Sequence, residues 1–66
     1  MPIRYSSREL IRIIANDGWY LVGIRGSHHK YKHPEKKGIV VVPHPNSKVP
    51  TGTALKILKS AGCAGH

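Results

Sequence analysis

The segment of residues 26–33 holds the side chains best suited to chemistry: a Gly-Ser start followed by histidines, lysines and one tyrosine. In a β-strand, alternate side chains point to opposite faces of the sheet. His28, Lys30 and Lys32 therefore share one face. Tyr31 belongs to the other face, and its bulk makes it the natural candidate for packing against a core. This register leaves His28 exposed among cations.

An imidazole beside ammonium groups suits the chemistry of RNA cleavage. RNA is cut when its own 2′-hydroxyl attacks the adjacent phosphate, which requires a base for that proton and an acid for the departing 5′ oxygen. Histidine, with an ordinary pKa of about 6.5, serves in either role near neutral pH. Lys30 and Lys32 would hold the phosphate, so we predict His28 as the catalytic residue. From spacing alone such a stripe is more typical of phosphate binding, and a non-catalytic RNA-binding module is the alternative.

Three further positions are candidates for assisting this chemistry. Gly26 has no side chain and would let the substrate backbone approach closely, whereas Ser27 either orients the start of the strand or donates to a phosphate. His44 stands between two prolines, where a rigid loop would present it as a second acid or base, although such a histidine is more often a hydrogen-bonding turn residue. The histidines lack structural zinc spacing and the chain has 1 cysteine, so we expect no metal and no cofactor.

Local signals predict the elements that must hold these residues in place. Ser6 followed by Glu9 is a capping-box pattern, Leu10 and Ile14 recur at helical spacing, and Gly18 ends the run. These signals predict a helix over residues 7–16. Segments rich in β-branched and aromatic residues predict three strands, at residues 19–25, 28–33 and 39–42. A second helix is predicted over residues 51–61.

Finer expectations concern the second helix and the start of the first strand. Thr51 is expected to cap the second helix. The apolar face of that helix is expected to consist of Ala54, Leu55, Leu58 and Ala61, with Ile57 at its edge. At the start of the first strand, one of Trp19 and Tyr20 is expected in the core and the other at the surface.

The connections between these elements define the fold. Two short turns, residues 26–27 and 34–38, join consecutive strands and predict an antiparallel meander. Helices at both ends of such a sheet must bury their apolar stripes on one face and leave the other open. We predict an α+β, double-stranded-RNA-binding-like α-β-β-β-α domain, with a three-stranded antiparallel sheet and both helices on one face. The 66-residue chain has room for one domain, residues 1–66.

The charge balance indicates the class of partner. Eleven lysines and arginines against 3 acidic residues give a formal net charge of +8, which is typical of nucleic-acid binders because phosphates attract the domain and released counterions favour binding. A small interaction domain that docks an acidic protein is a further alternative. The single cysteine, the absence of a secretory signal and the absence of an apolar run near ~20 residues favour a soluble cytoplasmic protein that does not cross a membrane.

Motifs along about residues 3–63 resemble those of the HicA family of toxin ribonucleases. The Gly-Ser-His segment between the first two predicted strands is the most specific of them. The resemblance is carried by Ser7-Arg8-Glu9-Leu10, Gly18-Trp19, Gly26-Ser27-His28-His29-Lys30-Tyr31, Val42-Pro43-His44-Pro45 and Thr51-Gly52-Thr53.

The resemblance implies a fold, an activity and a partner. The family has the double-stranded-RNA-binding-like fold, and its members cleave messenger RNA and transfer-messenger RNA without a metal. Each member is paired with a HicB antitoxin that binds it and covers its active site. The family's catalytic histidine lies in the Gly-Ser-His segment and corresponds to His28. The resemblance and the strand register therefore predict the same catalytic residue.

Overall fold

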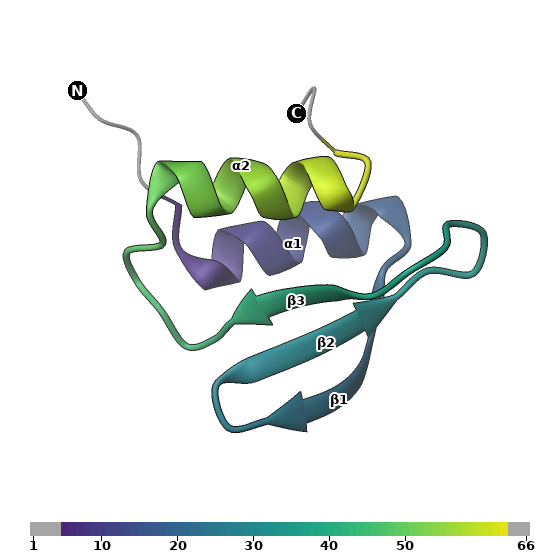
Figure 1. The fold of residues 1–66 in the computed structure, drawn as a ribbon, viewed down its shortest axis with the longest axis horizontal. Helices are drawn as coiled ribbons and strands as arrows, with labels where there is room; N and C mark the ends of the chain where they lie inside the picture. Colours follow the sequence, from purple (N-terminus) through teal and green to yellow (C-terminus); the bar gives the residue numbers. More distant parts are fainter. Residues whose placement is uncertain (1–4, 64–66) are drawn as a thin grey trace.

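The computed structural model describes residues 5–63, and the ends of the predicted domain, residues 1–4 and 64–66, lie outside the described residues. Two helices enclose three strands in the chain order (Figure 1). The elements are α1 (Ser7–Asp17), β1 (Tyr20–Arg25), β2 (His28–Lys32), β3 (Val40–Pro43) and α2 (Thr51–Ser60). The predicted α+β fold of α-β-β-β-α order is confirmed. No helix among residues 5–63 is long and apolar enough to cross a membrane.

Both ends of α1 are fixed by the residues that predicted them. The backbone N–H of Glu9 donates to the Ser6 hydroxyl at 3.1 Å, and the Glu9 carboxylate accepts from the backbone N–H of Ser6 in return, so the predicted capping box is present. At the other end, Gly18 has φ 114°, in the left-handed region that favours glycine. Its N–H donates to Ala15 and that of Trp19 donates to Ile14, which is the Schellman pattern of a helix end.

The Schellman bond explains why β1 begins one residue later than predicted. The N–H of Trp19 is used to end α1, so strand pairing starts at Tyr20, opposite Lys32. Trp19 is 3% exposed and its indole N–H donates to the Ala61 carbonyl, whereas Tyr20 is 50% exposed. The expectation that one of these two aromatic residues lies in the core and the other at the surface is confirmed.

The sheet is an antiparallel meander with β2 in the middle. Residues 26–27 form the tight turn between β1 and β2, and Gly26 has φ 61° whereas no non-glycine residue of the described chain has positive φ. A positive φ at the first turn position alone is the type II′ pattern, whose twist suits a hairpin. The turn sets Arg25 opposite His28, and β3 sets Pro43 opposite His28 from the other side.

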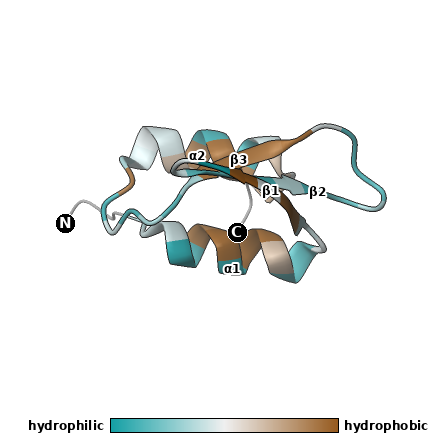
Figure 2. Ribbon diagram, turned by 90° about the horizontal axis from the view of Figure 1, so that it is seen from below, coloured by the Kyte–Doolittle hydropathy of each residue, from teal (hydrophilic) through white to brown (hydrophobic). Residues whose placement is uncertain are grey.

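The core lies between the helices and one face of the sheet. Figure 2 shows α1 as a separate layer below the sheet. In the same view α2 lies at the height of the sheet, beside the strongly hydrophobic ribbon of β3. Both helices contact β3 and each other. The buried residues form a single cluster: Leu10, Ile14, Trp19, Tyr31, Val40, Val42, Val49, Ala54, Ile57, Leu58 and Ala61. The burial of Tyr31 confirms the predicted register of β2.

Two expectations about α2 are wrong. Thr51 is its first helical residue and not its cap, because the N–H of Ala54 donates to the Pro50 carbonyl and makes Pro50 the cap. Leu55 is 50% exposed while Ile57 is buried. The two residues lie on opposite sides of the Ala54–Leu58 stripe, and the side that turns inward is set by where β3 and α1 contact the helix.

A polar clamp holds the loop between β2 and β3 at the end of the sheet. The His33 Nδ1 accepts from the backbone N–H groups of Glu35 and Lys36, so its Nε2 carries the proton that is donated to the Asp17 carbonyl at 2.7 Å. The Lys36 ammonium donates to the Asp17 carboxylate and to the Ala61 carbonyl. This clamp joins the ends of α1 and α2 to the loop.

Candidate active site on the open face of the sheet

His28 is the first residue of β2, and its side chain is exposed on the sheet face opposite the core. Burial along β2 establishes this direction, because Tyr31 is 5% exposed and alternate residues point to opposite faces. The neighbours on either side fix the backbone of His28: it pairs with Arg25 of β1 and with Pro43 of β3. The backbone N–H of His44 also donates to the Ser27 carbonyl at 2.7 Å, which ties the start of β2 to the end of β3.

Three cations share the open face with His28. Lys32 is exposed and Lys30 is half-buried. Both lie on the same face of β2 as His28, as the alternation of side chains along the strand predicted. Neither side chain makes a hydrogen bond or ion pair with another of the described residues, so both ammonium groups are free to bind an anion. Arg25 is the third cation, set directly opposite His28 by the register. Sequence reasoning missed Arg25, although a two-residue turn at 26–27 already implies this pairing.

Gly26 and Ser27 form the turn that precedes His28. The positive φ of Gly26 requires glycine for the turn itself, and a Cβ at this position would meet nothing within 4 Å. No described residue fills the space beside the turn. Ser27 is exposed, and its carbonyl accepts a hydrogen bond from the backbone N–H of His44. The backbone of Ser27 therefore positions the start of β2. Contact of either residue with RNA stays a prediction.

His29 points to the core side of the sheet and meets His44 there. The two imidazole rings lie edge to face, with centroids 4.9 Å apart. The Nδ1 atom of His29 is buried and has no hydrogen-bond partner among residues 5–63. The adjacent histidines of β2 therefore have different surroundings: His28 faces solvent and cations, whereas His29 packs under the sheet.

His44 is held by the start of α1. Its Nδ1 lies 2.7 Å from the Ser7 hydroxyl, and that hydroxyl also accepts from the backbone N–H of Asn46 at 2.9 Å. Ser7 is 2% exposed, so this contact is a buried tie between α1 and the loop after β3. His44 lines a hollow with Ser7 and Arg8, separate from the surface that His28 lines. Its role as a second acid or base stays a prediction.

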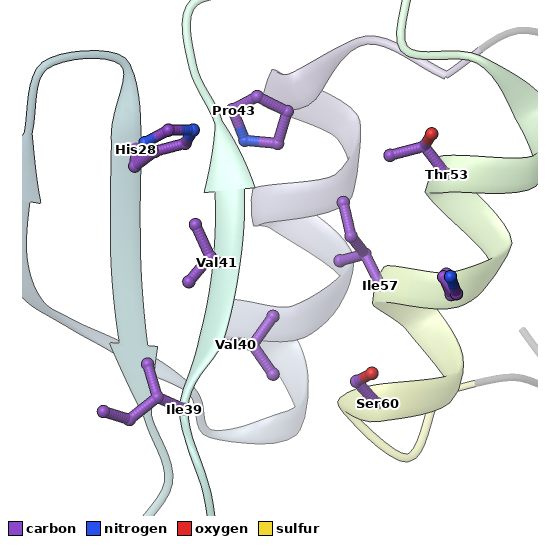
Figure 3. A pocket seen from close by; sticks show the side chains of 9 residues that line it. His28, Ile39, Val40, Val41, Pro43, Thr53, Ile57 and Ser60 are labelled. Carbon is purple, nitrogen blue, oxygen red and sulfur yellow. The ribbon is translucent and has the colours of Figure 1, made fainter.

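A groove runs from His28 across β3 to α2 (Figure 3). Its volume is about 340 Å³, near the lower end of the 300–1,000 Å³ or so of small-ligand pockets. The lining is aliphatic along β3 and mixed along α2. We use "the groove" for the hollow lined by His28, Ile39, Val40, Val41, Pro43, Thr53, Lys56, Ile57 and Ser60. Sequence reasoning did not identify this open groove.

The described residues offer little for metal or thiol chemistry. Among residues 5–63, no group of three or more His, Cys, Asp or Glu side chains is placed to hold a metal ion. Cys63 is half-buried, and burial raises the pKa of its thiol, which disfavours the reactive thiolate. The chemically distinctive arrangement is therefore His28 with its three cations and the adjoining groove.

One comparison with known proteins identifies a family for this chain. No curated protein matches the chain. The family model described as the HicA toxin of bacterial toxin-antitoxin systems matches residues 7–63, a span that includes the whole sheet, both helices and every residue of the open face named above. The chain therefore belongs to the HicA toxin family.

Proposed function

We propose that this toxin is a metal-independent endoribonuclease that cuts messenger RNA, and transfer-messenger RNA, with His28 as its catalytic residue. The observation that carries the proposal is the setting of His28: an exposed imidazole at a fixed strand position, opposite Arg25 and on the same face as Lys30 and Lys32. Membership of a toxin family supports an activity that harms the cell in which the protein is made. The net charge of +8 supports a nucleic acid as the target of that activity.

The reaction needs only groups of the RNA and of this face. The 2′ oxygen loses its proton to a base and bonds to the adjacent phosphorus, the bond from phosphorus to the 5′ oxygen breaks, and an acid protonates that oxygen. The products are a 2′,3′-cyclic phosphate and a 5′-hydroxyl. His28 performs one of the two proton transfers. Arg25, Lys30 and Lys32 stabilise the negative charge that gathers on the phosphate oxygens.

A HicB-type antitoxin is the proposed partner. An exposed catalytic face on a domain of net charge +8 requires a cover, and acidic or polar elements laid across His28, Lys30 and Lys32 would provide one. Charge complementarity would make association fast and salt-sensitive, while apolar contacts would slow dissociation. RNA and antitoxin would then compete for one surface.

The chemistry of the product ends tests the proposal. Purified protein is incubated with a labelled transcript in excess chelator, and the ends of the fragments are identified by mass spectrometry. We expect cutting in chelator, with cyclic phosphate and 5′-hydroxyl ends, and no cutting where the nucleotide at a mapped site carries a 2′-O-methyl group. Cutting that stops in chelator, or that leaves 5′-phosphate ends, would contradict the mechanism.

The alternative is a non-catalytic RNA-binding module, and the free cations Lys30 and Lys32 would serve it equally well. The same experiment separates the two functions. A binding module shifts the transcript in a salt-dependent way and leaves it intact, whatever the ratio of protein to RNA.

A further inference from the structure

The groove opens on the same face as His28, yet the proton transfer proposed for His28 does not use it. Val41 pairs with Lys30, so its side chain belongs to the open face, and it is 39% exposed. Ile39, just before β3, is 53% exposed. Aliphatic side chains thus lie uncovered directly beside the cationic strand, in a domain whose helices already bury a complete core. These exposed side chains offer a contact surface to a ligand that has an apolar part.

The far wall of the groove is one side of α2. Thr53, Ile57 and Ser60 follow one another at helical spacing and line the groove together with Lys56. In Figure 3, Ile57 points toward β3 while Thr53 lies at the end nearest Pro43 and Ser60 at the opposite end. Two hydroxyl groups therefore border the aliphatic floor, one at each end.

The lining suits a flat ring carried on an anionic backbone. Valine, isoleucine and proline side chains offer apolar surface to the face of a ring, and the hydroxyls of Thr53 and Ser60 offer hydrogen bonds to its edge. Of the nine described residues that line the groove, none is acidic, and Lys56 adds a cation. The volume of about 340 Å³ suits one small group and not a length of peptide. A nucleotide has this combination of base and phosphate.

We propose that the groove receives the base of a nucleotide that flanks the scissile phosphate, an inference that rests on the proposed ribonuclease function and extends it to substrate selection. The phosphate stays at His28 and its cations, the base crosses β3 into the groove, and Lys56 binds a neighbouring phosphate. Thr53, at the end nearest Pro43, contacts the edge of the base. These contacts give the enzyme a preference for particular nucleotides beside the cut.

A two-by-two binding experiment tests the occupant. The ligands are a short 2′-O-methyl oligonucleotide, which has no 2′-hydroxyl to react, and a set in which each position in turn is abasic. The proteins are wild type and Thr53→Leu, which places a larger apolar group in the groove at an exposed helical position where leucine is well tolerated. We expect wild type to bind the intact oligonucleotide about 5- to 150-fold more tightly than one abasic version, as the loss of a stacked base predicts. Thr53→Leu should bind the two alike.

A matched pair of lysine variants tests the phosphate contact. Lys56 lines the groove, whereas Lys59 is exposed on the same helix outside it. Lys56→Met should shallow the slope of log affinity against log salt by about 0.7, the value for one phosphate contact on a single strand. Lys59→Met should leave the slope unchanged. Equal slopes for the two variants would contradict the assignment of Lys56.

The outcomes separate this inference from the proposed function. If wild type cuts unmodified RNA but no abasic position changes its affinity, or if Thr53→Leu keeps the wild-type preference for the intact ligand, the groove does not hold a base. If Thr53→Leu weakens only antitoxin binding, the occupant is a protein side chain and the inference is wrong. If the base preference is present but unmodified RNA is never cut, the groove inference stands and the ribonuclease function fails.

Discussion

Ser7→Ala should destabilise the fold strongly, although Ser7 lies outside the catalytic face. Ser7 is 2% exposed, and its hydroxyl accepts from the N–H of Asn46 and contacts His44 Nδ1. Alanine removes both contacts and leaves two partly buried polar atoms without partners. An unsatisfied buried group costs about 1–3 kcal/mol. Because both atoms are only partly buried, the lower part of that range applies to each, and we expect a loss of about 2–3 kcal/mol.

Such a loss is large for a domain of this size. A chain of 66 residues has an unfolding free energy of only about 3–10 kcal/mol, and about 4–8 °C of Tm corresponds to each kcal/mol. Thermal unfolding followed by circular dichroism should therefore show Tm lower by about 8–24 °C. The control is Ser47→Ala, an exposed serine in the loop after β3 that Ser7 contacts, expected within about 0.5 kcal/mol of wild type. A Ser7→Ala variant as stable as that control would refute the role of Ser7 as a buried tie.

Three further outcomes follow from the clamp and from the open face. Gly18→Ala should lower the unfolding free energy by about 1–3 kcal/mol in chemical denaturation, because φ is 114° and the new Cβ would lie 2.9 Å from His33 Nε2. Hydrogen bonding to Lys36 holds the pKa of Asp17 below its ordinary value. The stability that this ion pair contributes is present above the unfolded pKa of about 3.9 and is lost as pH falls through the folded pKa. Asp17→Asn should therefore lose less stability than wild type in acid titration. Lys32→Ala should shallow the salt slope of RNA binding by about 0.7 while sequencing of the fragments shows the same cut sites.

Local signals were sufficient to predict most of the fold. The capping box at Ser6 and Glu9, the left-handed Gly18 and the two-residue turn at 26–27 each depend on residues within a few positions of one another, and the structure contains all three. The alternation in β2 was equally local, and Tyr31 alone was enough to orient it. These features could be predicted because their hydrogen bonds close within one element or one turn.

The features that were missed depend on contacts between distant segments. The Ser7–His44 contact joins residues 37 positions apart, and no sequence pattern marks a buried serine one residue after a cap. The groove exists only because α2 runs beside β3. The choice between Leu55 and Ile57 as the buried residue has the same origin, since both border the apolar stripe of α2 and tertiary packing decides between them. Arg25 is the exception, because the hairpin turn alone would have identified it.

The central claim is that His28, and not the adjacent His29, acts on the RNA from the open face. The most direct test is the cleavage rate of His28→Ala beside His29→Ala, on one transcript, in chelator, at a temperature where both variants are folded. His28→Ala should keep the wild-type Tm, because its side chain is exposed, and should lose about 10²–10⁴-fold in rate. His29→Ala should be less stable, since it loses the ring contact with His44, and should retain most of the rate. An active His28→Ala beside a folded, inactive His29→Ala would contradict the account.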